Sequence, residues 1–224
     1  MKPLIVFDMD GVLAEVTESY RAAIIETVRH FTGVEIKPEA IQALKNRGGF
    51  NNDFLVSQVL CRGLGREVDY ETVREYLCRI FFGENNDGLI AREKWMPRGG
   101  FFARLGARYD FSIFTGRDRN ELAITLGRFA PEVPFSPIIT SDETTEPKPS
   151  PQGLQMIRAR RPGLSMCYVG DTVDDARSAR AAGVPFYGIA SPACAWQNEL
   201  RRLLAEEGAV AVLSDVNQLE DVLP

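Results

Sequence analysis

The chain has 224 residues, of which 45% are hydrophobic and 25% are charged, and its formal net charge is −5 at pH 7. This is the composition of an ordinary globular protein with one large core, or a core and a small second domain, and it excludes a disordered or fibrous chain. The acidic balance argues against general nucleic-acid affinity, and the single histidine, His30, nearly excludes histidine triads and multi-histidine metal sites.

The length of the apolar runs and the spacing of the cysteines indicate in which cellular compartment the protein is expected. No apolar run approaches the roughly 20 residues that cross a membrane, and the apolar N-terminal stretch is too short and too soon acidic for a secretory signal. The 4 cysteines lie far apart with no CxxC spacing, so reduced thiols are expected rather than disulfides or a zinc site. We therefore expect a cytoplasmic protein with no membrane or nucleic-acid partner. Its oligomeric state is not readable from the sequence.

The first predicted element is a short buried strand over residues 4–7 (LIVF), which two aspartates, Asp8 and Asp10, follow at once. An ionised carboxylate is costly to bury without a partner, so both acids are expected where the strand ends, and Gly11 supplies a turn there. The carboxyl ends of strands in parallel α/β sheets are where ligands bind, which makes these acids candidates for chemistry. From this segment alone, a polar turn without function is the alternative.

The next part of the chain, from about residue 17 to residue 82, predicts consecutive amphipathic helices. Apolar residues keep helical spacing over residues 20–31, and the segments 54–64 and 70–82 do likewise. No convincing strand interrupts them. This region is expected to be all-helical.

From residue 98 onward, short apolar runs alternate with helical stretches. The strand candidates span residues 111–114, 137–140, 166–169, 186–189 and 210–213. The helices between them are expected over residues 99–105, 120–129, 151–160, 174–182 and 196–206.

This alternation predicts an α/β fold with a Rossmann-like parallel sheet core and helices on both faces, in which residues 4–7 form the missing first strand. The helical block is then an inserted all-helical cap domain. We expect residues 1–14 and 95–224 to form the α/β catalytic core and residues 15–94 to form the cap.

Two other predicted strand ends carry groups that suit an anion. Thr115 follows the strand at 111–114 and offers a hydroxyl, and Gly116 lets backbone N–H groups approach an anion closely. Lys148 lies between two prolines in the loop after residues 137–140. Taken singly, Thr115 could be a loop hydroxyl and Lys148 a solvated charge.

A third strand end carries further acids. Asp171 follows the strand predicted at 166–169, and Asp174 and Asp175 open the next predicted helix. Aspartates in this pattern would also serve as a helix N-cap and an acidic first turn. Together with the groups at the other strand ends, they suit a phosphoryl group and a magnesium ion.

These segments resemble the haloacid dehalogenase-like phosphohydrolases. "DMDGVL" is similar to the first motif of that family, Thr115 to its second, Lys148 in "KPSP" to its third, and "GDTVDDARSARAAG" to its fourth. Each match alone is a weak signal, but four in order at predicted strand ends are a specific one. The resemblance covers nearly the whole chain, including a helical cap inserted after the first motif. It implies a Mg²⁺-dependent phosphatase that acts on a small-molecule phosphate ester.

The resemblance implies a role for each acid of the first motif. Asp8 would attack phosphorus and form an aspartyl phosphate, and Asp10 would protonate the leaving oxygen and later deprotonate the attacking water. Mg²⁺ would be held by Asp8, the backbone carbonyl of Asp10, and Asp171, because hard oxygen ligands are those that magnesium prefers.

The remaining motif residues would bind the phosphate or support the metal. Thr115, Gly116 and Lys148 would bind the phosphate, and the lysine would neutralise its charge in the transition state. Asp175 would steady the lysine or a metal-bound water. The sequence leaves open whether Asp174 does this instead.

Substrate selection is expected from the segment "LKNRGGFNND" between two predicted cap helices, where paired glycines make a flexible turn. By the resemblance, this is where a cap loop reads the leaving group; a solvated helix connection is the alternative. Arg117, just after Thr115, could also meet the substrate. The donors that the segment offers are Lys45, Arg47, Asn51 and Asn52.

Several other functions share part of this pattern. A phosphomutase of the family would also keep Asp8 and Asp10. A phosphonate hydrolase typically has alanine in place of the second aspartate and uses a cap lysine, so Asp10 counts against it although Lys45 lies in a suggestive region. A dehalogenase needs neither magnesium nor this second acid, and the intact motifs disfavour a silent binding module. The sequence does not identify the substrate; histidinol phosphate or another biosynthetic phosphate is a hypothesis.

Overall fold

The computed structural model describes residues 2–224. The chain divides into two compact units: one joins the segment ending at Ala14 with Trp95–Pro224, and the other is Glu15–Lys94. Both crossings between the units lie in a two-stranded sheet, β2 (Ala14–Glu15) and β3 (Lys94–Trp95).

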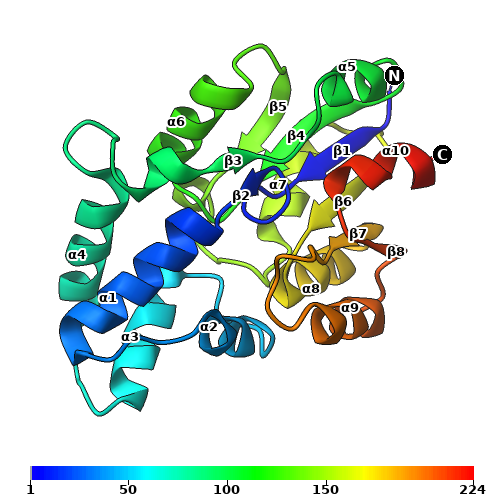
Figure 1. Ribbon diagram of the computed structural model, residues 1–224. Coiled ribbons are helices and arrows are strands. Elements are labelled where there is room, and N and C mark those ends of the chain that lie inside the picture. The colour runs from blue at the N-terminus through cyan, green and yellow to red at the C-terminus, as the bar shows by residue number, and fades with distance from the viewer. Residues whose placement is uncertain (1) are drawn as a thin grey trace. The chain divides into compact units, whose positions relative to one another are not determined.

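The first unit is built on a six-stranded sheet with the strand order β5-β4-β1-β6-β7-β8 (Figure 1). Every pairing between neighbouring strands is parallel. This confirms the predicted α/β fold with a parallel, Rossmann-like sheet. The strands are β1 (Leu4–Phe7), β4 (Asp110–Phe114), β5 (Phe135–Ile139), β6 (Met166–Gly170), β7 (Phe186–Ile189) and β8 (Ala211–Leu213).

Helices flank this sheet, and β1 explains why both faces need cover. Successive side chains of a strand point to opposite faces. Leu4 and Val6 pack with residues of α7 and α8, whereas the Phe7 ring contacts Phe101 of α5. An apolar run without alternation therefore belongs to a strand that is buried on both faces. The helices are α5 (Phe101–Gly106), α6 (Arg119–Phe129), α7 (Gln152–Arg160), α8 (Val173–Ala182), α9 (Gln197–Glu206) and α10 (Leu219–Val222).

The register of the central strands decides which residues meet at the carboxyl edge. Phe7, the last residue of β1, pairs with Ile113 of β4 and Val169 of β6. The residues that follow these three strands therefore emerge side by side. The register brings the loops after β1, β4 and β6 together, although they are distant in sequence.

One strand begins earlier than predicted. The sequence suggested residues 137–140, but β5 begins at Phe135 and includes Pro137. Proline lacks the N–H that a central strand needs, and it is tolerated here because β5 lies at the edge of the sheet. The register between β4 and β5 is irregular between Phe111 and Ile113.

The second unit is helical, as the periodicity between residues 17 and 82 predicted. Asn52 and Asp69 accept hydrogen bonds from backbone N–H groups at the starts of α3 and α4, and Gly33 ends α1 with φ 75°. No helix of residues 2–224 combines the length and the apolar character needed to cross a membrane. The helices of this unit are α1 (Ala22–Thr32), α2 (Pro38–Lys45), α3 (Asp53–Gly63) and α4 (Tyr70–Phe82), and a π-helical turn, Thr17–Arg21, leads into α1.

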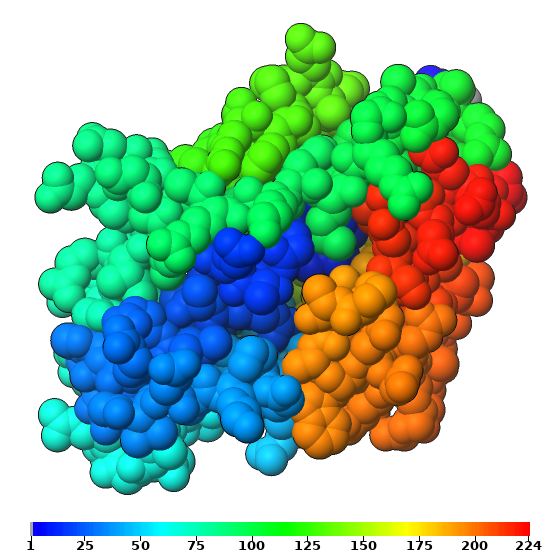
Figure 2. Space-filling model, viewed as in Figure 1, coloured from blue at the N-terminus to red at the C-terminus, as the bar shows by residue number. Residues whose placement is uncertain are grey.

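The C-terminal segment is tied to the start of the second half of the first unit. Arg104 of α5 pairs with Glu220 of α10 at 2.8 Å, and the Asn217 side chain accepts from the Arg98 N–H and donates to the Met96 carbonyl. Figure 2 shows these segments, in green and red, lying against each other on the surface. The contacts join the C-terminal segment to α5 and to the residues just before it.

Because β1 is buried on both faces, shortening one of its side chains should lower the free energy of unfolding strongly. Phe7→Ala removes a ring that is 0% exposed and contacts three other phenylalanine rings, so it should lower the free energy of unfolding by about 3–5 kcal/mol. Urea unfolding followed by circular dichroism measures this. Val222→Ala, at a position 39% exposed, should stay within about 0.5 kcal/mol of wild type. Equal losses for both variants would contradict the burial of β1.

Candidate active site

The loop after β1 carries two carboxylates to the carboxyl edge of the sheet. Asp8 follows β1 directly, and its backbone N–H donates to the Val169 carbonyl at 2.8 Å. The chain turns at Gly11, which has φ +71°, and a Cβ at that position would lie 1.9 Å from Asp171 Oδ2. Glycine is therefore required both for the turn and for the close approach of Asp171.

The ammonium of Lys148 lies between two of the predicted acids. Its Nζ is 2.9 Å from Asp8 Oδ1 and 2.7 Å from Asp175 Oδ1, and all three side chains are buried. The Nζ also lies 4.8 Å from the centroid of the Phe114 ring and 5.4 Å from that of Tyr168. One buried cation thus pairs with acids from two separate elements, which satisfies the requirement that buried charges have partners.

Asp175, near the start of α8, contacts Lys148 through one carboxylate oxygen and the helix N-terminus through the other. Its Oδ2 accepts from the Thr172 N–H at 3.0 Å, and its own N–H donates to Thr172 Oγ1 at 3.1 Å. The capping role and the site role therefore coexist, because Oδ2 caps the helix while Oδ1 faces the lysine. Asp174, one position earlier in the helix, is also buried, and which of the two acids supports the metal site stays a prediction.

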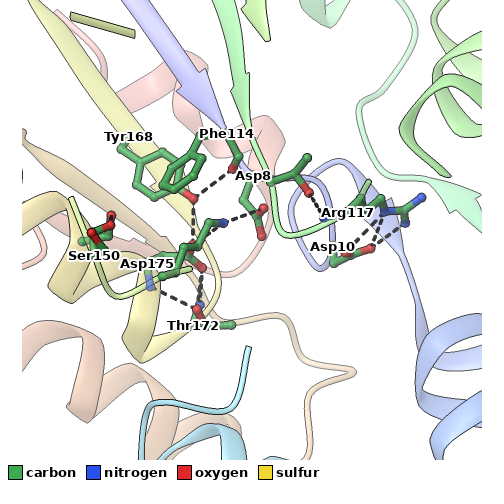
Figure 3. A network of polar contacts seen from close by, with 11 residues as sticks. Asp8, Asp10, Phe114, Arg117, Ser150, Tyr168, Thr172 and Asp175 are labelled. Atoms are coloured by element: carbon green, nitrogen blue, oxygen red, sulfur yellow. Dashed lines mark hydrogen bonds and ion pairs between the residues drawn. The ribbon is translucent and has the colours of Figure 1, made fainter. Parts of the chain in front are cut away.

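Tyr168 supports this arrangement from within β6, although it was not among the predicted site residues. Its hydroxyl oxygen lies 2.7 Å from Asp175 Oδ1 and 3.1 Å from the Phe114 carbonyl oxygen (Figure 3). The available signal was a tyrosine in an apolar strand, since a buried phenol needs a polar partner. The strand pattern alone could not say which partner it has.

Burial and charge shift the pKa values of these groups in different directions. Burial raises the pKa of Asp8 to about 7, a rise that Lys148 opposes and Asp175 adds to. Burial would also raise the pKa of Asp175, but the charge of Lys148 and the hydrogen bonds from Lys148, Thr172 and Tyr168 together outweigh it, so the net shift is downward. Burial lowers the pKa of Lys148, but Asp175 and Asp8 raise it by more, so the lysine is a cation at neutral pH.

Three carboxylates form a cluster that could hold a metal ion. Asp8, Asp171 and Asp175 each offer an oxygen, and these oxygens lie within 4.8 Å of one another. Hard oxygen donors fit a divalent cation such as magnesium. The cluster contains two of the predicted metal ligands, and it adds Asp175, which the sequence placed in a supporting role.

The predicted phosphate-binding residues lie at two neighbouring strand ends. Thr115 is buried, and its N–H donates to the Ile139 carbonyl at 3.1 Å. Thr115 Oγ1 accepts from the Arg117 N–H at 3.2 Å. Gly116 lies between them in the chain. Phosphate binding by Thr115, Gly116 and Lys148 stays a prediction.

The Arg117 side chain is not presented to solvent. Its guanidinium is buried and forms an ion pair with Asp10, with the shortest N–O distance at 2.5 Å (Figure 3). Its Nη1 donates to Thr125 Oγ1 at 2.6 Å. The sequence suggested a direct substrate contact for Arg117, and no local pattern indicated its burial against Asp10.

Apart from Arg117, the predicted specificity residues belong to the Glu15–Lys94 unit. Lys45 ends α2 and pairs with Asp53 at 2.7 Å. Asn52 caps α3 and its amide donates to the Tyr70 hydroxyl at 2.9 Å. Contact with a substrate stays a prediction for the whole set, which is Lys45, Arg47, Asn51 and Asn52.

The chain matches the family model of the haloacid dehalogenase-like hydrolases over residues 2–183. It is 33% identical to imidazoleglycerol-phosphate dehydratase of Phytophthora nicotianae, over 98% of this chain and 52% of that protein. It is 23% identical to phosphoglycolate phosphatase of Pseudomonas fluorescens, over 96% of this chain and 78% of that protein. The chain thus spans about half the length of the first of these relatives.

A solved structure has the same fold. A haloacid dehalogenase-like hydrolase from Bacteroides fragilis superimposes with a TM-score of 0.75 at 21% identity, over 98% of this chain and 100% of that chain. At this identity the likeness establishes the fold alone.

The Tyr168 hydroxyl should contribute measurably to the stability of the site. Tyr168→Phe leaves Asp175 Oδ1 with one fewer polar contact and should lower the free energy of unfolding by about 1–3 kcal/mol. Tyr187→Phe, in the neighbouring strand β7 and also buried, is the matched control. Urea unfolding measures both. If both variants lost the same free energy, the hydroxyl–carboxylate contact would not be the cause.

The raised pKa of Asp8 predicts a pH-dependent stability difference in metal-free protein. Folded Asp8 keeps its proton up to about pH 7, whereas an unfolded aspartate loses it near pH 3.8, so raising the pH through this window favours unfolding. Asp8→Asn removes this effect. As the pH is raised through this window, the free energy of unfolding of Asp8→Asn should rise by about 2–4 kcal/mol relative to that of wild type. Above the window the difference should stay constant.

Denaturant unfolding in the presence of chelator, at several pH values, measures this difference. Asp221→Asn, an exposed carboxylate on α10, is the control and should show no such trend. A difference between Asp8→Asn and wild type that did not change with pH would show that folded Asp8 ionises like an exposed aspartate.

Proposed function

The chain belongs to the haloacid dehalogenase-like hydrolase family, and we propose that it is a magnesium-dependent phosphatase that hydrolyses a small-molecule phosphomonoester through an aspartyl phosphate. The observation that carries the proposal is the buried contact of Lys148 with Asp8 and Asp175 beside Asp171. It supplies a carboxylate nucleophile, a fixed cation and a cluster of acids at one edge of the sheet.

Asp8, Asp171 and the backbone carbonyl of Asp10 would hold the magnesium ion, with Asp175 beside them. When bound, magnesium offsets the negative charges of the carboxylates and the phosphate, which otherwise repel each other. Lys148 stays protonated between its two acids and would neutralise the oxygens of the phosphoryl group. Thr115 would donate its hydroxyl to the same oxygens.

The reaction would proceed in two steps. In the first, an Asp8 carboxylate oxygen attacks phosphorus, the bond between phosphorus and the leaving oxygen breaks, and Asp10 gives its proton to that oxygen. In the second, Asp10 takes a proton from water as the water oxygen attacks phosphorus. The bond between phosphorus and Asp8 then breaks, which releases inorganic phosphate and regenerates both acids.

We further propose that the Glu15–Lys94 unit acts as a helical cap that selects the leaving group and excludes water. Its two connections to the first unit lie together in the β2–β3 sheet, an arrangement that suits a hinge. The paired glycines Gly48 and Gly49 both have φ 80° and lie between α2 and α3, next to the predicted specificity residues.

The relatives suggest which substrates to test first. One is named as a phosphatase of phosphoglycolate and another as a dehydratase of imidazoleglycerol phosphate, and both compounds are small phosphomonoesters. Histidinol phosphate, the hypothesis from the sequence, also carries an imidazole and a phosphate. We propose a substrate of this class, with a polar or heterocyclic leaving group.

Phosphate release from a panel of metabolite monoesters tests the proposal, with magnesium and with chelator. We expect strong turnover of at least one compound by wild type only when magnesium is present. Asp8→Asn should lower turnover by at least about 10⁴-fold while the fold is retained, because it removes the nucleophile. Asp221→Asn, exposed on α10, is the matched carboxylate-to-amide control and should keep full activity.

Other outcomes distinguish the alternatives. Turnover that Asp8→Asn retains would contradict the aspartyl phosphate. An isomerised product without free phosphate would indicate a phosphomutase, and cleavage of a phosphonate would indicate a phosphonate hydrolase. No reaction with any of these compounds would favour a silent binding module.

A further inference from the structure

The contact between Arg117 and Asp10 has a specific geometry. Arg117 Nε and Nη2 both donate to Asp10 Oδ1, at 3.0 and 2.5 Å, and Nε lies 3.3 Å from Oδ2. Oδ1 therefore accepts two short hydrogen bonds, whereas Oδ2 has one longer contact. The Arg117 side chain is 1% exposed and that of Asp10 is 34% exposed. The arginine thus holds the carboxyl from the protein side and leaves Oδ2 as the less engaged oxygen.

The guanidinium is itself held rigidly. Its Nη1 donates to Thr125 on α6 at 2.6 Å, and Thr125 is buried. The backbone of Arg117 is fixed on both sides, because its N–H donates to Thr115 and its carbonyl accepts from the Ser141 N–H at 3.0 Å. The next residue, Asp118, caps α6 with a reciprocal contact to Glu121. Arg117 cannot move without disturbing the start of α6.

A buried guanidinium is costly, so its position suggests a role beyond packing. An apolar side chain of similar volume would fill the same space at less desolvation cost. What only arginine provides is a planar guanidinium with several N–H donors, two of which can hold the orientation of one carboxyl group. The group it fixes here is the one that exchanges a proton in the proposed reaction.

We propose that Arg117 is a positioning residue for Asp10, which it orients so that Oδ2 carries the proton to the leaving oxygen. This inference rests on the proposed function, because only that reaction requires Asp10 to transfer a proton. It gives Arg117 a role in the first step through Asp10, in place of the direct substrate contact expected from the sequence. In that step a bond forms between an Asp8 oxygen and phosphorus, the bond between phosphorus and the leaving oxygen breaks, and the proton passes from Asp10 Oδ2 to the leaving oxygen.

The test uses two substrates whose leaving groups differ in their need for a proton. Nitrophenolate is a stable anion and leaves para-nitrophenyl phosphate without general-acid help, whereas the alkoxide of an alkyl phosphate needs a proton in the transition state. The alkyl substrate is the monoester that wild type hydrolyses best in the panel. The measured quantity is kcat/KM, since it reports leaving-group departure and excludes later hydrolysis of the aspartyl phosphate.

Arg117→Met should lower kcat/KM for the alkyl substrate by about 10²–10³-fold and that for the nitrophenyl substrate by less than about tenfold. Asp10→Asn should show the same selectivity. The double variant should lose no more than Asp10→Asn alone, because both changes act through one carboxyl. If Arg117→Met acted only by disturbing the structure, it would lower kcat/KM equally for both substrates. Its effect would then add to that of Asp10→Asn.

Two further variants complete the design. Arg201→Met removes a guanidinium that donates to the Val212 carbonyl at 2.8 Å, away from the site, and should leave both kcat/KM values within about threefold of wild type. Thr125→Val keeps the ion pair and removes the hydroxyl that holds Nη1, so it tests the inference if Arg117→Met does not fold. Thr125→Val should lower kcat/KM selectively for the alkyl substrate, by about 3–10-fold.

The outcomes separate this inference from the proposed function. Equal losses on both substrates in Arg117→Met or Thr125→Val, with a selective loss in Asp10→Asn, would overturn the positioning role alone. If Asp10→Asn lowered kcat/KM equally for both substrates, the acid role of Asp10 would be overturned, and the positioning role of Arg117 with it. Absence of phosphate release by wild type from every monoester would overturn the proposed function itself.

Discussion

The candidate site depends on one buried ammonium. Lys148 Nζ lies 2.9 Å from Asp8 and 2.7 Å from Asp175, and it is the cation that makes burial of both acids tolerable. Without it, two carboxylates would face each other in a low-dielectric environment, at a cost of about 3–5 kcal/mol or more. The two acids are compensated unequally. Burial raises the pKa of Asp8, whereas for Asp175 the effect of burial is outweighed by Lys148 and by hydrogen bonds from Thr172 and Tyr168, so its pKa is lowered. The group proposed as nucleophile is therefore the one whose negative charge the protein compensates least.

The backbone must place these charges within contact distance, and small residues make this possible. A Cβ on Gly11 would overlap Asp171, and a Cβ on Gly170 would lie 2.5 Å from the Asp175 Cβ. The parallel register aligns the ends of β1, β4 and β6, so that the loops after them share one edge. The glycines and the register together allow three acids, a lysine and an arginine to pack without separating the strands that carry them. The proposed chemistry thus follows from the sheet's construction, as ligand binding at the carboxyl ends of parallel strands does generally.

Two neighbouring networks share this edge and suit different parts of the proposed reaction. In the first, Lys148 contacts both Asp8, the proposed nucleophile, and Asp175, which also contacts Tyr168. In the second, Arg117 contacts Asp10 and is itself held by Thr125. The Asp8 side chain is 6% exposed, whereas that of Asp10 is 34% exposed. This difference fits a nucleophile that must be kept from water and an acid that must meet both a leaving group and, later, a water molecule.

The sequence alone determined the fold class and the family, because both depend on local patterns. Apolar runs alternating with helical periodicity predict a parallel sheet, and the motif residues are contiguous or fall directly after predicted strands. It missed the start of β5 at Phe135, since a proline in an edge strand resembles a strand boundary. Only the tertiary structure showed that Asp175 contacts Lys148, that Tyr168 supports Asp175, and that Arg117 is buried against Asp10. Residues 10 and 117 are joined through the register of β1 and β4, and no periodicity along the chain encodes a contact between side chains that the sheet brings together.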